Sequence, residues 1–440
     1  MDMVINHTSD QHPSFQQAEK SDTSKYHSWY VWTKMRPADY NKGMVFPGFQ
    51  KEIWSIDPKL NEYYYHRFYK FQPDLNYDNA DVKAEALHIL GYWLNQGMDG
   101  FRLDAVPFII EEMRPGAKKL NHDFDFITQM RHFVQAQKPD AFLLGEANVL
   151  PNENQDYFGK KGERMQILFN FFANQHLFYA LASGKLEEYK KALLATNNIP
   201  PSSQWANFLR NHDEVDLGRL TKSQREQVYA RFGPEKNMQL YDRGIRRRLT
   251  TMLHNPAQLK LAYSLLFSLP GTPVMRYGDE IGMGDDLNLQ ERLSVRTPMQ
   301  WSDEKNAGFT GAEKAFRPVI SQGAYAYQAV NVTTEQKDSA SLLNWMEKLV
   351  KQRKTCPEFG FGTWKILDSG TPDVLAIRYT YQGKSLITLH NFSPKPHRAR
   401  ILVSEKSFTS LLDNNKAIAV KNNKLKITLT GYGYQWFRVN

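Results

Sequence analysis

The chain has 440 residues, a length that accommodates roughly two to three domains. Hydrophobic residues make up 41% and charged residues 23%, a balance that excludes a largely disordered chain. The net charge of +9 is dispersed, with one dense basic run at 246–248, so the composition does not indicate a nucleic-acid partner. The single cysteine, Cys356, excludes an internal disulfide and a cysteine-based metal site.

The first residues of the chain, MDMVINHTSD, lack the basic and apolar regions of a secretory signal. No apolar run reaches the ~18 residues that a membrane span needs. We therefore predict a cytoplasmic protein with no membrane partner. The short apolar strand at 3–5 is followed at once by Asn6 and His7, which indicates that the sequence starts inside a structural element.

The predicted elements begin with an irregular, aromatic-rich stretch over 8–72, in which no helical period persists. From Asn79 to Gln96 apolar residues recur at helical spacing, and Gly97 is typical of the position just after a helix. Further helices are predicted at 124–137, 175–181, 256–269 and 341–354. Buried strands are predicted at 99–106, 141–145, 167–170, 205–209 and 273–277.

This alternation of strands and helices favours parallel βαβ units. After about residue 362 the pattern changes, and strands follow one another without helices between them. These strands are predicted at 373–381, 385–389, 399–403 and 424–429. The sequence therefore predicts an α/β domain followed by a small antiparallel β domain.

Three acidic residues stand at or just after the ends of predicted strands: Asp104 in GFRLDA, Glu146 in LLGEAN and Asp213 in RNHDE. In a closed parallel barrel the carboxyl ends of the strands converge on one rim, where the chemistry takes place. Retaining cleavage of a glycosidic bond needs two carboxylates, one as nucleophile and one as acid and base. Each acid taken alone is better explained as a turn residue or a helix cap. The three together favour a catalytic site.

Basic and polar residues flank these acids. Arg102 precedes Asp104 by two positions, so on a strand both side chains point the same way and the guanidinium would keep Asp104 ionised. His7 and His212 could donate hydrogen bonds to sugar hydroxyls. His7 could also be a hydrogen-bonded core histidine, and Asn6 and Asp74 could be turn residues.

Taken together, these segments resemble the signatures of the α-amylase superfamily, glycoside hydrolase family 13. The matching segments occur in that family's order, and they are DMVINH (2–7), QPDLN (72–76), GFRLDA (100–105), GEAN (145–148) and NHD (211–213). The resemblance implies an α/β protein with a TIM (β/α)8 barrel that lacks its first two βα units, over 1–7 and 76–361. It further implies an inserted subdomain B over 8–75 and a C-terminal antiparallel β-sandwich over 362–440. We expect such an incomplete barrel to be a fragment of a longer chain.

The resemblance also implies roles for individual residues. Asp104 would be the nucleophile, Glu146 the general acid and base, and Asp213 the stabiliser of the transition state. The implied substrate-binding residues are His7, Arg102, His212 and Arg296. A structural Ca²⁺ is implied between barrel and insertion, held by oxygen atoms of Asn6, Asp74 and Glu111, and no organic cofactor is expected.

Three longer stretches, at 100–108, 278–283 and 295–309, are similar to the trehalose synthase family within that superfamily. This similarity implies that maltose and trehalose are interconverted by intramolecular glucosyl transfer, with maltose, trehalose or a short α-glucan as the small-molecule partner. The RTPMQW segment is shared with α-glucosidases, so an α-glucosidase or α-amylase-type hydrolase with a wetter pocket is the first alternative. An inactive amylase-fold fragment or binding protein is the second, and the presence of all three acids disfavours it.

Overall fold

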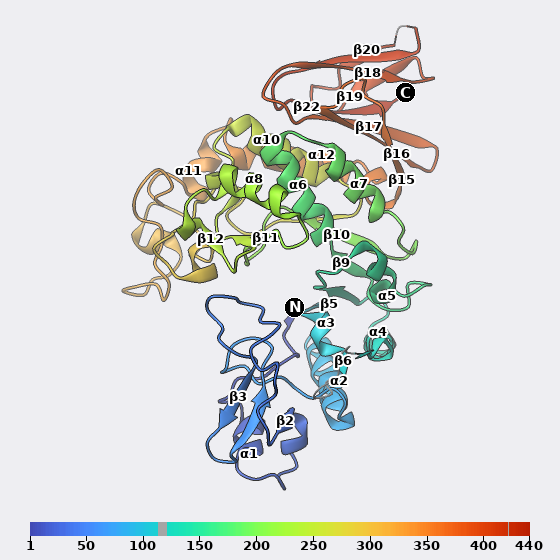
Figure 1. The fold of residues 1–440 in the computed structure, drawn as a ribbon. Coiled ribbons are helices and arrows are strands. Elements are labelled where there is room, and N and C mark those ends of the chain that lie inside the picture. Colours follow the sequence, from blue (N-terminus) through green and yellow to red (C-terminus); the bar gives the residue numbers. More distant parts are fainter. Residues whose placement is uncertain (113–120, 421) are drawn as a thin grey trace. The chain divides into compact units, whose positions relative to one another are not determined.

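The computed structural model describes residues 1–112, 121–420 and 422–440 of the chain (Figure 1). It divides into two compact units. Unit 1 comprises Met1–Phe169 and Asn198–Gln204, and unit 2 comprises Asn170–Asn197 and Trp205–Asn440. Each unit contains buried hydrophobic clusters of its own.

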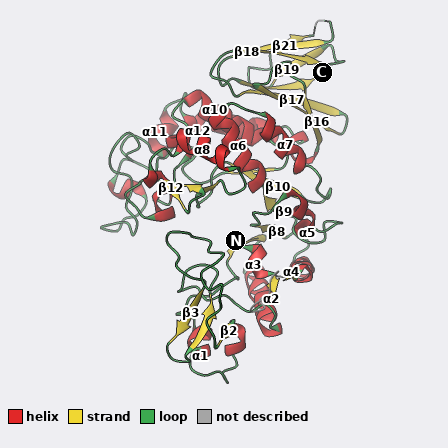
Figure 2. Ribbon diagram, viewed as in Figure 1, coloured by secondary structure: helices red, strands yellow, loops and turns green. Residues whose placement is uncertain are grey.

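Unit 1 contains a parallel sheet in which β1, β5, β8 and β9 pair in that order, with helices in the connections (Figure 2). The register places Met3 opposite Leu103 and Leu103 opposite Gly145. The elements of this part are β1 (Asp2–Met3), α2 (Ala80–Asn95), β5 (Gly100–Leu103), α3 (Val106–Ile109), β6 (Glu111–Glu112), β7 (Asn121–His122), α4 (Phe124–Gln137), β8 (Phe142–Gly145), α5 (Asn154–Phe158) and β9 (Ile167–Phe169). This register brings the residues that follow β5 and β8 next to each other.

Capping residues mark the ends of two helices of unit 1. The Asn79 side chain accepts a hydrogen bond from the N–H of Asp81 at the start of α2, and Gly97 adopts a φ of 95° just beyond its end. The Asp123 side chain caps α4 by accepting from the N–H of Phe126. The predicted helix at 124–137 is confirmed with these bounds.

The stretch predicted to be irregular contains a small sheet, so that expectation is wrong for part of it. Strands β2 (Trp32–Thr33), β4 (Glu62–Tyr65) and β3 (Trp54–Asp57) pair antiparallel in this order, and α1 (Pro13–Ala18) precedes them. Phe15, Tyr30 and Tyr64 form a buried aromatic cluster there. The strands are too short for their side-chain alternation to stand out in the sequence.

Unit 2 contains a parallel strand pair, β10 and β14, in which Phe208 lies opposite Val274. A short antiparallel ribbon of β11, β13 and β12 follows β10. The elements of this part are α6 (Phe171–Ser183), α7 (Glu187–Ala195), β10 (Gln204–Phe208), β11 (Val215–Asp216), α8 (Lys222–Phe232), β12 (Gln239–Leu240), β13 (Gly244–Ile245), α9 (Leu249–Met252), α10 (Pro256–Ser268), β14 (Thr272–Val274), α11 (Val332–Lys337), α12 (Leu342–Lys354) and α13 (Glu358–Phe361).

The C-terminal part of unit 2 is antiparallel and forms two sheets, one of β15–β16–β17–β22–β19–β20 and one of β18–β21. Their bounds are β15 (Thr363–Leu367), β16 (Val374–Tyr381), β17 (Lys384–Asn391), β18 (His397–Leu402), β19 (Ser407–Ser410), β20 (Ala417–Ala419), β21 (Lys424–Leu429) and β22 (Tyr434–Val439). Side chains from both sheets, such as Ile387 and Leu425, share one hydrophobic cluster. The predicted fold class, a parallel α/β part followed by an antiparallel β part, is confirmed.

A search for membrane-crossing helices over the described residues finds none with the length and apolar character that crossing requires.

Candidate active site

The first cluster of predicted site residues lies in unit 1, where the pairing of β5 with its neighbours continues one residue beyond the strand ends. The N–H of Asp104 donates to the carbonyl of Met3 (3.1 Å), and the N–H of Glu146 donates to the carbonyl of Leu103 (3.0 Å). Both acids are therefore held by backbone hydrogen bonds at neighbouring strand ends, which confirms the strand-end position predicted for them.

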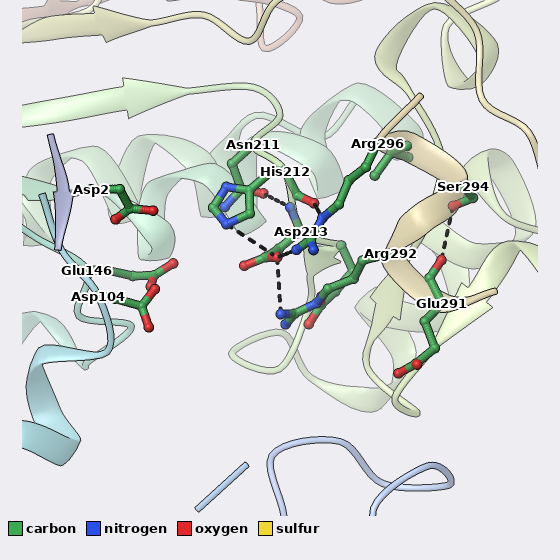
Figure 3. A network of polar contacts seen from close by, with 12 residues as sticks. Asp2, Asp104, Glu146, Asn211, His212, Asp213, Glu291, Arg292, Ser294 and Arg296 are labelled. Carbon is green, nitrogen blue, oxygen red and sulfur yellow. Dashed lines mark hydrogen bonds and ion pairs between the residues drawn. The ribbon is translucent and has the colours of Figure 1, made fainter. Parts of the chain in front are cut away.

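One guanidinium joins the two carboxylates. The Arg102 Nη1 lies 2.5 Å from Asp104 Oδ1, and its Nη2 lies 2.7 Å from Glu146 Oε2. Asp2 also contacts Arg102, at 2.8 Å. The Arg102 side chain is only 14% exposed, and although burial alone would lower its pKa, the Glu146 and Asp104 carboxylates outweigh burial and raise it. Arg102 is thus a permanent cation that holds both acids, and Figure 3 shows their carboxylates side by side.

The backbone just after Asp104 turns sharply towards Glu146. Ala105 adopts a left-handed conformation with φ of 50°, which is unfavourable for a residue with a side chain. The Ala105 N–H lies 3.4 Å from Glu146 Oε2, and the Val106 N–H donates to the carbonyl of Glu146 at 3.1 Å. The strained residue therefore lies directly after Asp104 and beside the Glu146 carboxylate.

His7, the histidine predicted to bind substrate, belongs to the same unit. Its Nε2 lies 2.8 Å from the amide nitrogen of Gln72, and its ring packs against Phe68 with centroids 5.2 Å apart. Burial lowers the pKa of His7, against a smaller opposing effect of the Asp104 charge. His7 is therefore neutral at pH 7, a form that donates one hydrogen bond and accepts another.

The three predicted calcium ligands also lie in unit 1. Asn6 Nδ2 donates to Asp74 Oδ2 at 3.2 Å, and the backbone N–H of Arg67 donates to Asp74 Oδ1 at 3.0 Å. Glu111 is ion-paired with the Arg67 guanidinium. Burial raises the pKa of Asp74 to about 7, so a nearby cation would stabilise its charged form. The oxygen donors fit a hard cation chemically, but Arg67 already neutralises Glu111, and no cluster of three or more acidic, histidine or cysteine ligands is found within the described residues.

The second cluster lies in unit 2, on the loop after β10. Asp213 Oδ1 accepts from Arg296 Nη2 at 2.6 Å and lies 3.1 Å from Arg292 Nη1, and His212 Nε2 lies 3.6 Å from the same oxygen (Figure 3). The Asn211 side chain accepts from the N–H of Asp213 at 3.0 Å and shapes the turn. Burial would raise the pKa of Asp213, but Arg292, His212 and Arg296 outweigh it and lower the pKa below its usual value.

The structure thus gathers Arg102, Asp104 and Glu146 at one place in unit 1, and His212, Asp213 and Arg296 at one place in unit 2. Sequence reasoning missed Arg292, which stands four positions before Arg296 in ERLSVR and was not recognised as a partner of Asp213. It also missed Gln72, although this residue opens the QPDLN segment that was singled out.

Comparison with known proteins identifies the class to which this fold and these clusters belong. The sequence model of the α-amylase catalytic-domain family matches residues 1–241 and 237–360. The sequence model of the sucrose hydrolase-like C-terminal domain matches residues 383–438. The chain belongs to the α-amylase family, glycoside hydrolase family 13, and is an enzyme of that family.

Within this family, the chain is similar to several individual proteins. The chain is 35% identical to the trehalose synthase/amylase of Mycobacterium tuberculosis, over 100% of its own length and 75% of the relative. It is 27% identical to the oligo-1,6-glucosidase of Bacillus cereus, over 89% of the chain and 74% of the relative. Among solved structures, the α-amylase from H. orenii matches 99% of the chain and 79% of that structure with a TM-score of 0.76 and 25% identity.

Proposed function

We propose that this chain interconverts maltose and trehalose by transferring a glucosyl unit without releasing it. The observation that carries the proposal is the bridge that Arg102 makes between Asp104 and Glu146 at neighbouring strand ends. Such a pair of carboxylates supplies the nucleophile and the proton donor of a retaining mechanism. The 35% identity to a trehalose synthase/amylase over the whole chain supports this reaction over other retaining reactions.

In the first step the Asp104 carboxylate attacks the anomeric carbon of the glucosyl unit, and the glycosidic bond breaks. The proton of the Glu146 carboxylic acid passes to the departing oxygen, which leaves as glucose. Arg102 contacts both carboxyl groups and holds them next to each other.

In the second step the glucose turns and its anomeric hydroxyl attacks the glucosyl carbon. The hydroxyl proton passes to the Glu146 carboxylate, the ester bond to Asp104 breaks, and trehalose forms. Two displacements at one carbon restore its original configuration. If water takes the place of glucose, the same residues perform hydrolysis, and the similarity to an oligo-1,6-glucosidase supports this second candidate.

The remaining predicted residues have supporting roles in this proposal. The neutral His7 ring and His212 would donate hydrogen bonds to hydroxyls of the glucosyl unit. Asp213, kept ionised by its arginine partners, would stabilise positive charge at the anomeric carbon, and Arg296 would hold both Asp213 and substrate. Family membership supports the assignment of these residues to the same reaction as Asp104.

The test is to incubate the protein with unlabelled maltose and an excess of ¹³C-labelled glucose, and to separate the products by chromatography and mass spectrometry. Intramolecular transfer predicts trehalose without label as the main product, because the released glucose does not leave. Labelled trehalose would show that glucose exchanges with solvent, and glucose alone would make the chain a hydrolase. The Asp104→Asn variant, run in parallel, detects contaminating activity.

We also propose that Asn6, Asp74 and Glu111 hold a structural Ca²⁺, with Glu111 exchanging its Arg67 partner for the ion. The ion would tie Asn6, three residues beyond β1, to the insertion, and it would take no part in bond breaking. A calcium chelator should then lower the melting temperature of the wild type, and Glu111→Gln should weaken the response. Glu85→Gln, at a glutamate whose side chain is 45% exposed, is the control. An unchanged melting temperature with chelator would remove calcium from the proposal.

A further inference from the structure

Three buried arginines form a cluster next to the loop that carries Asp213, and all three belong to unit 2. They are Arg210, Arg248 and Arg276, with exposed fractions of 2%, 0% and 7%. Arg210 follows β10 by two residues and Arg276 follows β14 by two residues. Because these strands pair in parallel with their last residues opposite each other, the two arginines extend neighbouring strands towards the loop.

Arg210 holds the backbone of Asp213 itself. Its Nη2 donates to the carbonyl of Asp213 at 2.6 Å, and its Nε donates to the carbonyl of Arg247 at 2.8 Å. These two hydrogen bonds fix the peptide plane that follows Asp213 against a separate segment of the chain. The direction in which the Asp213 side chain leaves the backbone is therefore set in part by Arg210.

Arg276 joins the Asp213 loop to the segment that supplies its ion-pair partner. Its Nη1 donates to the carbonyl of Asn211 at 3.0 Å, and its Nη2 donates to the carbonyl of Val295. Val295 directly precedes Arg296, whose guanidinium pairs with Asp213 Oδ1 at 2.6 Å. One buried side chain thus sets both ends of the Asp213–Arg296 pair.

Burying these cations is unfavourable, and nearby carboxylates such as Asp279 offset only part of this cost. Burial lowers the pKa of Arg210 to about 10, and burial together with the Arg248 charge lowers the pKa of Arg276 to about 9. Both remain protonated at pH 7. The buried carboxylate of Asp279 is 3.4 Å from Arg248 and opposes part of this charge. Apolar side chains often fill such space at lower cost, so the hydrogen bonds of these guanidinium groups point to a role beyond packing.

We propose that Arg210 and Arg276 are positioning residues that set the orientation of Asp213 and of its partner Arg296 for the proposed glucosyl transfer. This inference rests on the role proposed for Asp213. Arg248 provides the internal contrast, because it is equally buried but directs its hydrogen bonds to the carbonyl of Tyr277 at 2.7 Å and to Asp279.

The experiment compares Arg210→Lys and Arg276→Lys with the matched control Arg248→Lys. All three keep the positive charge, and lysine cannot reach two carbonyl groups as the guanidinium fork does. We measure kcat and KM for maltose, the melting temperature, and hydrogen–deuterium exchange in the peptide covering 211–216. A misplacement of the Asp213 carboxylate by about 1 Å costs up to ~100-fold in rate.

The expected result is a kcat about 10- to 100-fold lower for Arg210→Lys and Arg276→Lys, with KM changed less than kcat and faster exchange over 211–216. Arg248→Lys should keep kcat within about threefold and leave exchange in this peptide unchanged, even at an equal loss of melting temperature. Equal effects on kcat and exchange in all three variants would overturn the proposal. The three arginines would then only stabilise the packing of unit 2. If the wild type fails to act on maltose, the proposed function fails, and the exchange data still decide whether Arg210 and Arg276 hold the loop.

Discussion

The acids Asp104 and Asp213 are both held by arginine, but the two units achieve this in different ways. In unit 1 the partner of Asp104 is Arg102, two positions earlier on the same strand and shared with Glu146. In unit 2 Asp213 has two partners, Arg292 and Arg296, and the latter lies 83 positions later in the chain. The first arrangement depends on strand geometry and one cation, and the second on long-range folding and two cations.

The largest expected effect comes from replacing the acid of unit 1. Asp104→Asn should lower kcat on maltose by at least about a thousand-fold, because an amide oxygen is a far weaker nucleophile than a carboxylate. The fold should persist, since the amide keeps the size of the side chain and the backbone hydrogen bond to Met3 remains. The check combines steady-state kinetics with the melting temperature. A folded variant with nearly wild-type turnover would contradict the nucleophile assignment.

The next largest effect on kcat is expected where one arginine serves two acids, and a smaller one where two arginines serve one acid. Arg102→Met should reduce kcat by about a hundred-fold or more and lower the melting temperature, because two partly buried carboxylates lose their common cation. Arg296→Met should cost about tenfold in kcat, because Arg292 still holds Asp213. The comparison is made at equal pH and salt.

A larger loss of kcat in Arg296→Met than in Arg102→Met would contradict this difference between the two units. If Arg296→Met lowered kcat as much as Arg102→Met, Arg292 would not substitute for Arg296 as the partner of Asp213. Arg317→Met, at an exposed arginine that belongs to neither cluster, is the control for loss of charge alone and should leave kcat unchanged.

The contrast between the two acids also explains what the sequence could predict. The alternation of side chains along a strand was enough to place Arg102 beside Asp104, and apolar spacing was enough for the helix at 124–137. Arg292 could not be paired with Asp213 in this way, since nothing local links a short helical turn at 291–295 to a loop after β10. The sheet at 32–65 was missed for another reason, because its strands of two to four residues are too short to show a period.

The smallest expected effect is a change in pH dependence. Arg292, Arg296 and His212 lower the pKa of Asp213, so the stabilisation that its charge provides is present above the usual carboxyl pKa and is lost only as the pH falls through the lowered value. In Arg292→Gln one source of this lowering is removed and the pKa of Asp213 rises. The acid limb of kcat/KM should therefore move to higher pH, while kcat at pH 7 changes little.

The measurement is a profile of kcat/KM from pH 3 to 7 for the wild type, Arg292→Gln and Arg317→Gln. Only the first variant should shift the acid limb, because Arg317 lies on an exposed segment, whereas Arg292 is 3.1 Å from the Asp213 carboxylate. An acid limb that stays in place in Arg292→Gln would mean that a group other than Asp213 controls activity at low pH. In that case the duplicated arginines of unit 2 would serve to orient Asp213 rather than to keep it charged.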